Sequence, residues 1–584
     1  MAEKETSMLL SRQENSHRST APSSHFDADE ATLHYSKSVL QKVHLLRSHK
    51  KLCDVTLSAE GREINAHRAI LSACSAYFLA MFTHELLESG QDVVQIKGMS
   101  GDVLSSLIDF AYTGILTVTV ENVQDTLAAA SLLQIKQAQE VCCEFLKKHL
   151  DVSNCLGVKN FAEVNGCTQL SEVVDSFARR HFLEVTNTNE FFHSSAEGIA
   201  SLISSNDLNV PREEVVYAAV MSWVRQDPGE RGQQLPKLLK HVRLPLLAVD
   251  CLMNDVDRDP IVKQSIECRD LLDDAKRYHL MPADRDIRSA NPCFFPRKST
   301  VGVVYAVGGK ESSESITHSV ETFSLLENKW SEGTPLMVRR QQLGVGVLDG
   351  KVYAVGGSDG SLRLSTVECF DPATQFWTYV APLSTCRSGV AVGVMGGAMY
   401  AAGGYDGRSC LNTVERFDLE KNVWVTVAQM SSRRSFPGVA VFGDKLYTFG
   451  GNDGTSFLNV VECYDPHVNR WRTLPPLGKP RAGIGVAVLG QQIFVAGGND
   501  GTSRLDSVEF LDVRSGKWYP AAKMTSARDG VCLCAIGAHM VAVGGINGPS
   551  YLKTAELYDP VNNSWDLVSS METCRAAAGV AVVM

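Results

Sequence analysis

Short runs in which hydrophobic and polar residues alternate dominate the C-terminal half of the chain. In one stretch of 47 residues they fall at Gly344–Leu348, at Val352–Gly357, around Glu368 and around Trp377, and an Asp-Gly pair follows the second run. Alternation with a period of two is typical of half-buried β-strands, so each stretch predicts four short strands. A four-stranded unit of this length cannot bury both faces of its sheet alone, and we expect neighbouring units to stack against it.

The stretch recurs six times with its key residues in register. One tryptophan per repeat keeps the 47-residue spacing: Trp330, Trp377, Trp424, Trp471, Trp518 and Trp565. A glutamate and an arginine keep it too: Glu321, Glu368, Glu415, Glu462, Glu509 and Glu556, and Arg340, Arg387, Arg434, Arg481, Arg528 and Arg575. Gly-Gly pairs begin at Gly308, Gly356, Gly403, Gly450, Gly497 and Gly544. Six radially stacked units predict an all-β propeller, and the order Gly-Gly, hydrophobic-Glu, aromatic, Trp resembles the kelch repeat.

The two ends of this region predict a closed ring. Arg575–Met584 (RAAAGVAVVM) reads like the opening strand of a repeat such as Arg387–Val394, but no repeat follows it. The first repeat has too few residues between Arg297 and Val303 for such a strand. We therefore expect the C-terminal strand to complete blade one of a six-bladed kelch propeller at 300–584, because this pairs two edges that would otherwise be exposed.

The N-terminal part predicts helices around a short extended segment. Apolar residues at helical spacing form one stripe at Val39, Leu40, Val43 and Leu46, ahead of an extended segment at Cys53–Leu57. The runs LCDVTL (from Leu52), INAHRAILSACSAYFLAMF (Ile64–Phe82) and LIDFAYTGIL (Leu107–Leu116) resemble a BTB domain. The resemblance implies an α/β domain at 33–150.

Amphipathic helical segments with Pro or Gly stops fill the region that follows. CLGVKNFAEVNGC (from Cys155), LISSNDLNV (from Leu202), EEVVYAAVMSWV (from Glu213) and HVRLPLL (from His241) resemble a BACK domain, which implies an all-α unit at 151–282. Trp223 lies on an apolar face there and is expected in the core. A charged, Pro-containing stretch at 283–299 is expected to be a linker. Residues 1–30 are polar and are expected to form a disordered tail.

Composition and charge exclude several kinds of partner. The 584-residue chain has a net charge of −10, which argues against a nucleic-acid-binding surface. No apolar run approaches the ~20 residues that span a bilayer, and the N-terminus has no signal-peptide core. We therefore expect a cytoplasmic protein, with a nuclear pool also compatible. The 16 cysteines follow no metal-ligand spacing, so reduced thiols are expected, and redox sensing by one of them stays an open alternative.

The residues do not predict an enzyme. A copper site would need clustered ligands, but the propeller holds only His318, His467 and His539, at unrelated positions within their repeats. The Gly-Gly pairs end strands and lack a following helix whose N-terminus could receive a phosphate. Their expected role is to allow close backbone approach near a crowded axis. No cofactor, metal or catalytic residue is predicted.

Differences between repeats indicate where the propeller binds its partner. The residue after each Gly-Gly opens an equivalent loop, so six unlike residues should ring one face: Lys310, Ser358, Tyr405, Asn452, Asn499 and Ile546. Further along the same loops come guanidinium and aromatic groups of the kind that dominate binding hot spots: Arg363, Arg408, Phe457, Arg504 and Tyr551. The repeated arginines are expected mainly to brace blades through the repeated glutamates. The resemblance to kelch proteins, in which some equivalent positions contact peptide, implies that one or two of them also do so here.

BTB, BACK and kelch segments in this order resemble the kelch-like family of substrate adaptors for cullin-3 ubiquitin ligases, and the BTB and BACK text resembles its diablo-type branch. The resemblance implies a non-catalytic adaptor that binds cullin-3 through its BTB domain and captures protein substrates through a short peptide motif. The main alternative is a cytoskeletal scaffold whose propeller binds actin. Neither function involves nucleic acid or a membrane.

The same resemblance assigns residues to two further surfaces. Leu86 and Glu88 of HELLES match the family's hydrophobic-x-Glu cullin motif. The cullin-binding surface is completed by Tyr112, Phe161 and Ala162. A homodimer is implied by the charged pair Asp54 and Arg68 and by the exchanged helix through Val39 and Val43.

Overall fold

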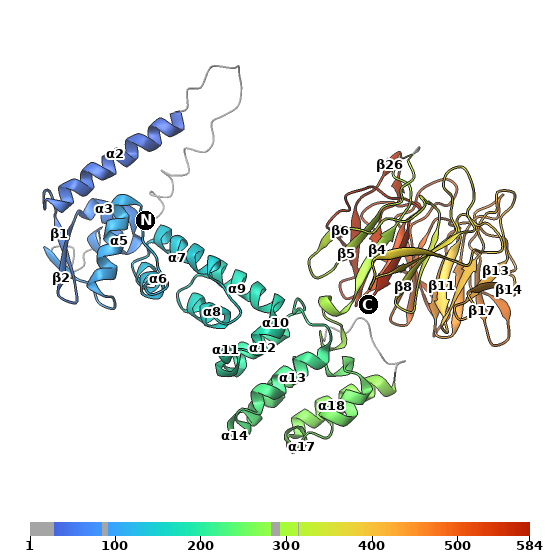
Figure 1. Ribbon diagram of the computed structural model, residues 1–584, viewed down its shortest axis with the longest axis horizontal. Helices are drawn as coiled ribbons and strands as arrows, with labels where there is room; N and C mark the ends of the chain where they lie inside the picture. Colours follow the sequence, from blue (N-terminus) through green and yellow to red (C-terminus); the bar gives the residue numbers. More distant parts are fainter. Residues whose placement is uncertain (1–27, 84–90, 282–291, 313–314) are drawn as a thin grey trace. The chain divides into compact units, whose positions relative to one another are not determined.

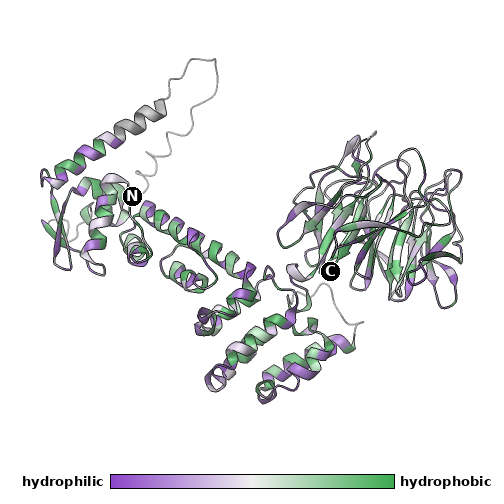
Figure 2. Cartoon of the chain, viewed as in Figure 1, coloured by the Kyte–Doolittle hydropathy of each residue, from purple (hydrophilic) through white to green (hydrophobic). Residues whose placement is uncertain are grey.

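The computed structural model describes residues 28–83, 91–281, 292–312 and 315–584. The chain divides into two compact units between Asp175 and Ser176, and Figure 1 shows the helices and strands of which they consist. The helices of both units carry interleaved hydrophobic and hydrophilic residues (Figure 2), as amphipathic helices around a core require.

The first unit is built on a three-stranded sheet. Its order is β2-β1-β3, with β1 antiparallel to β2 and parallel to β3. The strands are β1 Val55–Ala59, β2 Arg62–Ala66 and β3 Val93–Gln95. Glu60 and Gly61, both with positive φ, make the two-residue turn between β1 and β2, a conformation that matches the twist of the paired strands. This α/β arrangement confirms the predicted fold of the region.

Helices surround that sheet and bury its apolar residues. They are α2 Ala28–Ser48, α3 Arg68–Cys74, α4 Ala76–Thr83, α5 Gly101–Thr113, α6 Val123–Leu132, α7 Lys136–Lys148 and α8 Cys155–Val164. Leu57, Phe78 and Leu104 are fully buried in one core, against which Val43 of α2 packs. Because α2 begins at Ala28, order starts before the predicted residue 33, and the last three residues of the predicted tail are helical. The rest of that tail lies outside the described residues.

Helix α9, Thr168–Arg180, continues into the helical part of the second unit. There follow α10 Phe182–Val185, α11 Asn189–His193, α12 Ala196–Ser204, α13 Glu213–Val224, α14 Pro228–Arg231, α15 Leu235–Leu239, α16 Val249–Cys251, η4 Leu252–Val256, α17 Pro260–Gln264 and α18 Ile266–Leu280. Side chains of Thr188, Ser195 and Ser265 cap the helices that follow them. Trp223 is buried and its indole donates to the Ser194 carbonyl at 3.1 Å, which confirms it as a core residue.

The predicted linker is partly ordered. Short 3₁₀ turns form at η6 Pro292–Phe294 and η7 Lys298–Thr300. Between them Arg297 is fully buried, and its Nε and Nη2 each donate to the Glu213 carboxylate at 2.8 Å. The end of the predicted linker is therefore fixed to the helical domain by a buried ion pair. Residues 282–291 of the predicted linker lie outside the described residues.

Six four-stranded antiparallel sheets follow, one per sequence repeat. Blade one holds β4 Val303–Val307, β5 Val320–Ser324, β6 Lys329–Gly333 and β29 Gly579–Val583; blade two holds β7 Gly344–Leu348, β8 Lys351–Val355, β9 Val367–Asp371 and β10 Phe376–Val380. Blade three holds β11 Ala391–Met395, β12 Ala398–Ala402, β13 Val414–Asp418 and β14 Val423–Val427; blade four holds β15 Gly438–Phe442, β16 Lys445–Phe449, β17 Val461–Asp465 and β18 Arg470–Leu474. Blade five holds β19 Gly485–Leu489, β20 Gln492–Ala496, β21 Val508–Asp512 and β22 Lys517–Ala521; blade six holds β23 Cys532–Ile536, β24 His539–Val543, β27 Ala555–Asp559 and β28 Ser564–Val568. A small hairpin of β25 Ile546–Asn547 and β26 Ser550–Tyr551 decorates blade six.

The ring closes through the C-terminal strand, as predicted. Strand β29 pairs with β4 from Gly579↔Val307 to Val583↔Val303 and so supplies the inner strand of blade one. Inner strands contact each other in an unbroken circuit: β29 with β7, then β11, β15, β19, β23 and back to β29. The Trp330 indole also donates to the Ser569 carbonyl at 2.8 Å, which joins blade one to the end of the repeat region.

The repeated Arg, Glu and Gly-Gly residues join each blade to the next. The Arg340 carbonyl accepts from Gly309 of blade one at 2.8 Å, while its guanidinium donates to Glu368 and to the Gly356 carbonyl of blade two. A Cβ placed on Gly308 would meet the Arg340 carbonyl oxygen at 2.5 Å, so the first glycine of the pair allows this close approach. All six repeated arginines are at most 2% exposed. Bracing is therefore the role that their contacts support, and the predicted second role for one or two of them is not supported by their burial.

Candidate functional site

One end of the propeller channel is ringed by hydrogen-bonded backbone. The ring, called here the annulus, consists of the second residue after each repeated arginine: Gln342, Gly389, Phe436, Gly483, Gly530 and Ala577. Each backbone N–H donates to the carbonyl of the preceding member at 2.7–3.1 Å, and Gln342 closes the circle by donating to Ala577. All six have a left-handed φ between 48° and 66°. That conformation suits glycine but is unfavourable by about 1–2 kcal/mol for other residues. Gln342, Phe436 and Ala577 adopt it although they are not glycine.

The six residues predicted after the Gly-Gly pairs surround this annulus. Each forms a β-bridge with the residue directly before an annulus member, as Tyr405 does with Ser388 and Asn452 with Ser435. Lys310, Ser358, Asn499 and Ile546 make the equivalent bridges to Ala576, Gln341, Ala482 and Asp529. The structure therefore brings all six predicted residues to one end of the channel, called here the mouth.

The predicted mouth residues differ in how much surface they offer. Ser358 is only 2% exposed, and its hydroxyl donates to Leu362 and accepts from the Gly360 N–H. Ser358 therefore shapes its own loop, and its inclusion among the contact residues is not supported by its burial. In contrast, Arg363, Arg408 and Arg504 are exposed, whereas Phe457 and Tyr551 are half-buried. The Arg363 guanidinium lies 5.7 Å from the centre of the Tyr405 ring, so the two form a cation–π pair between loops of adjacent blades.

A cavity of about 350 Å³ opens at the mouth, and five of the six annulus residues line it. Its lining includes the apolar side chains of Phe436, Phe457 and Ile546 and the polar side chains of Asn452, Asn499 and Asp529. Sequence reasoning identified four of these six residues but missed Phe436 and Asp529. The signal that could have found them is the two positions after each repeated arginine, where the residue type changes from blade to blade.

Asp529 is the acidic group of this cavity. Its side chain is 25% exposed, its Oδ2 accepts from Asn499 Nδ2 at 3.2 Å, and Arg504 Nε lies 4.0 Å away. Burial, the largest effect, raises the pKa of the Asp529 carboxyl above its ordinary value, while the Asn499 hydrogen bond and Arg504 oppose the shift. A cation entering the cavity would join Asn499, the Gly530 backbone N–H and Arg504 as partners of this partly exposed carboxylate.

The first unit holds the residues predicted for cullin binding and dimerisation. Asp54 Oδ1 accepts from the Arg68 backbone N–H at 2.7 Å, and Arg68 Nε donates to the Asp54 carbonyl at 3.1 Å, so these two residues are brought together. On α2, Val39 is 41% exposed, whereas Val43 packs on the core. The described residues do not include Leu86 and Glu88.

Two residues predicted for the cullin surface are buried. Tyr112 is 1% exposed and its hydroxyl accepts from the His67 backbone N–H at 2.8 Å, while Ala162 is 0% exposed. Their direct contact with a partner is not supported by this burial, because both side chains lie in the core. Phe161, beside Ala162 on α8, is half-buried and keeps some surface.

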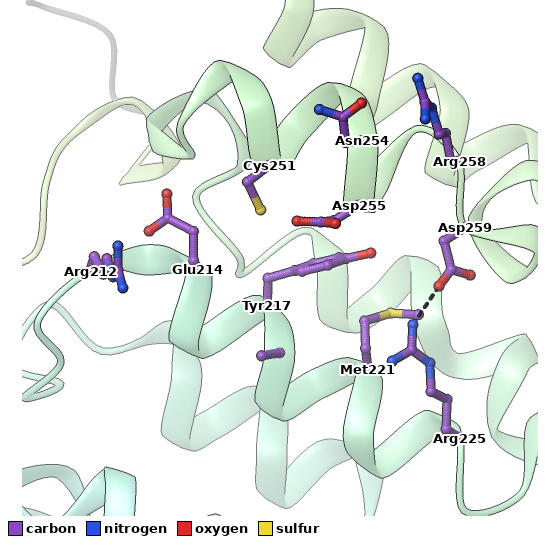
Figure 3. A pocket seen from close by; sticks show the side chains of 11 residues that line it. Arg212, Glu214, Tyr217, Met221, Arg225, Cys251, Asn254, Asp255, Arg258 and Asp259 are labelled. Carbon is purple, nitrogen blue, oxygen red and sulfur yellow. Dashed lines mark hydrogen bonds and ion pairs between the residues drawn. The ribbon is translucent and has the colours of Figure 1, made fainter.

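A second hollow, of about 620 Å³, lies among helices of the second unit. Figure 3 shows Tyr217 and Met221 of α13 facing Cys251 and Asp255 across it. An ion pair of Arg225 with Asp259 lies at one end, with an N–O distance of 2.8 Å. Tyr217 is 6% exposed, and its hydroxyl has no hydrogen-bond partner among the described residues. Burial raises the pKa of this hydroxyl, so Tyr217 stays neutral.

Replacing Tyr217 with Phe should leave the thermal stability of the chain unchanged or raise it slightly. A buried hydroxyl without a partner carries a desolvation cost of about 1–3 kcal/mol, and the variant removes it while keeping the ring. As a control, Asp259→Ala removes both the Arg225 partner and the cap on the Ile261 N–H, and should lower stability by about 1–2 kcal/mol. Thermal melts of the two variants test this, and a clear loss in Tyr217→Phe would show that the hydroxyl is bonded.

The residues that the structure describes also bear on metal sites, membrane-spanning helices and reactive thiols. No group of three or more His, Cys, Asp or Glu side chains in those ranges is placed to hold a metal ion. Among the same residues, no helix has both the length and the apolar character needed to cross a bilayer. Burial raises the pKa of the Cys74 and Cys142 thiols to about 11, which opposes the thiolate form that redox sensing requires.

Comparison with protein families accounts for most of the chain. The BTB/POZ domain family matches residues 43–150, and the BACK (BTB And C-terminal Kelch) family matches 155–257. Kelch motifs match 302–337, 339–384 and 527–572, and the KLHDC2/KLHL20/DRC7 Kelch-repeats domain matches 381–526. Together the kelch matches cover all six sequence repeats and end before β29. With an α/β domain, a helical domain and a six-bladed propeller in this order, the chain belongs to the BTB-BACK-kelch family.

Proposed function

We propose that the chain is a non-catalytic substrate adaptor of a cullin-3 RING ubiquitin ligase. In this role the BTB domain binds cullin-3 and the propeller mouth holds the substrate. The order of BTB, BACK and kelch domains carries the proposal, because this architecture is typical of such adaptors. The mechanism is proximity: holding a substrate lysine near a charged ubiquitin-conjugating enzyme raises its effective concentration.

Cullin-3 would be bound mainly through Leu86 and Glu88. The resemblance of HELLES to the hydrophobic-x-Glu motif supports this assignment, with an apolar side chain filling a groove and a carboxylate fixing the register. Phe161 would extend the contact from α8. Tyr112 and Ala162 would act indirectly, by fixing the packing of α5 and α8 behind the contact surface.

Dimerisation would place two substrate receptors in one complex. Helix α2 supports this, because Val39, Leu40 and Leu45 are 41%, 38% and 57% exposed and leave apolar surface uncovered in the single chain. A helix exchanged between two copies would cover such surface. Two linked receptors add avidity for substrates that carry two motifs.

Combining Leu86→Asp with Glu88→Ala should abolish cullin-3 binding and leave the dimer intact. An aspartate in an apolar groove buries less apolar surface than leucine and places an unpaired charge there. The penalty is a few kcal/mol, which corresponds to about a hundredfold weaker binding of cullin-3. Co-purification of cullin-3 with the full chain measures binding, and light scattering after size exclusion measures the dimer.

Leu280→Asp serves as the matched control. It introduces the same charge at a leucine that is 81% exposed on α18 and should bind cullin-3 like the wild type. Equal recovery of cullin-3 by the double variant and this control would refute the assignment. If the wild type bound no cullin-3 but co-sedimented with filamentous actin, the cytoskeletal alternative would replace the proposal.

A further inference from the structure

One annulus residue has a backbone conformation that is unfavourable for its side chain. Gly389, Gly483 and Gly530 adopt the left-handed conformation without strain, so the position itself calls for glycine. Phe436 occupies the same position with φ of 53°, which is unfavourable for a bulky aromatic residue. Strain of this kind persists where the side chain has a function that glycine cannot supply.

The Phe436 side chain makes the mouth asymmetric. A Cβ placed on Gly389 would lie 3.0–3.1 Å from atoms of the Phe436 ring, so this ring covers the annulus on the blade-three side. On its other side Phe436 lines the cavity, where Gly483 and Gly530 contribute no side chain. The aromatic ring thus projects from an annulus position into the lining of a pocket to which the two glycines add only backbone.

The pocket combines apolar walls with one carboxylate. Phe436, Phe457 and Ile546 offer apolar surface, and all three are half-buried. Asp529 is the acidic member among the six residues that follow the repeated arginines, where the other blades have Gln341, Ser388, Ser435, Ala482 and Ala576. Its cationic neighbour, Arg504, has its Nε 4.0 Å from the Asp529 Oδ2 atom, a long distance for an ion pair.

We infer that this pocket selects a substrate peptide in which an aliphatic or aromatic residue lies next to a lysine or arginine. The apolar side chain enters between Phe436, Phe457 and Ile546, and the cation of its neighbour pairs with Asp529. A volume of about 350 Å³ is at the small end of ligand pockets and suits one or two side chains. The exposed Arg363 and Arg408 lie on the loops of blades two and three and favour acidic residues further along the same peptide.

This inference rests on the proposed function, and its test separates the two. A random 12-residue peptide library displayed on phage is panned against the immobilised full chain. The expected consensus has an apolar residue beside a basic one. Asp529→Asn, which keeps the shape of the side chain, should lose the basic preference and retain the apolar one. The affinity of a labelled consensus peptide is then measured by fluorescence polarisation.

Phe436→Gly is the decisive variant. Glycine suits the left-handed backbone, so the melting temperature should stay within a few degrees of the wild type, while peptide affinity falls about tenfold or more. Phe376→Gly is the control, because it removes a phenylalanine that is 70% exposed on β10 and should leave peptide binding unchanged.

The outcomes are distinct. If the wild type enriches no peptide, substrate capture at the mouth, and with it this part of the proposed function, fails. If enriched peptides are released by Tyr405→Ala and Arg408→Ala but bind Phe436→Gly and Asp529→Asn as tightly as the wild type, the proposed function stands and the pocket assignment falls. A consensus without an apolar residue beside a basic one would also overturn the inference.

Discussion

Removal of residues 579–584 is expected to open the propeller. The truncation deletes β29, whose five residues pair with β4 and whose neighbours are the inner strands β7 and β23. Ladder hydrogen bonds contribute about 1 kcal/mol each, so the loss is on the order of 5 kcal/mol before any apolar surface is counted. That is comparable with the whole stability of a typical domain. Melting of the full chain by circular dichroism and its sensitivity to protease should both show the loss.

Two further variants show whether ring closure is responsible. Removing Met584 alone, which is 90% exposed, should have almost no effect. Gly579→Val should reproduce much of the damage, because even a Cβ at this position would lie 2.0 Å from Val345 Cγ2 of blade two. A truncated chain that melted within a degree or two of the wild type would contradict the role assigned to β29.

The sequence predicts the propeller because its signals repeat. A contact that every blade needs, such as the buried pair of Arg340 with Glu368 or the close approach at Gly308, appears six times in the same register. The closing strand could be predicted for the same reason, since Arg575–Met584 carries the opening pattern of a blade without the rest of one. Periodicity therefore identified the scaffold and the face on which the mouth residues lie.

The chemistry of the mouth was harder to predict because it does not repeat. Phe436 and Asp529 lie beside a buried arginine that is identical in every blade, and only the backbone conformation reveals what their positions share. Ser358 shows the opposite error: its position predicted exposure, but its hydroxyl is used within its own loop. Sequence position locates a loop, whereas the exposure of each side chain depends on local hydrogen bonds.

The helical part of the second unit contains a charge cluster that amphipathic patterning could not predict. Glu213, at the first position of α13, is 5% exposed and accepts from Arg297 and from the backbone N–H of Arg243 at 2.9 Å. Arg243 is itself buried and donates to the Phe295 carbonyl at 2.5 Å. The pKa of Arg243 is lowered to about 10, mainly by burial and secondly by the charge of Arg297. The charge of Glu213 opposes this shift, so one buried carboxylate stabilises the Arg243 cation and also forms the ion pair with Arg297.

Glu213→Gln should consequently destabilise this region more than any loss of a surface ion pair. The isosteric amide keeps the volume but leaves two buried guanidiniums without an anion, a cost of about 3–5 kcal/mol. Arg297→Met should cost less, since it removes one of the two cations, and Arg225→Met should cost at most about 1 kcal/mol, because the Arg225 side chain is 60% exposed. Hydrogen exchange of residues 213–224 and 298–307 in the full chain measures local stability. A thermal melt of a multidomain chain would not separate this region from the others. Equal exchange in Glu213→Gln and Arg225→Met would show that the buried cluster is no more important than a surface pair.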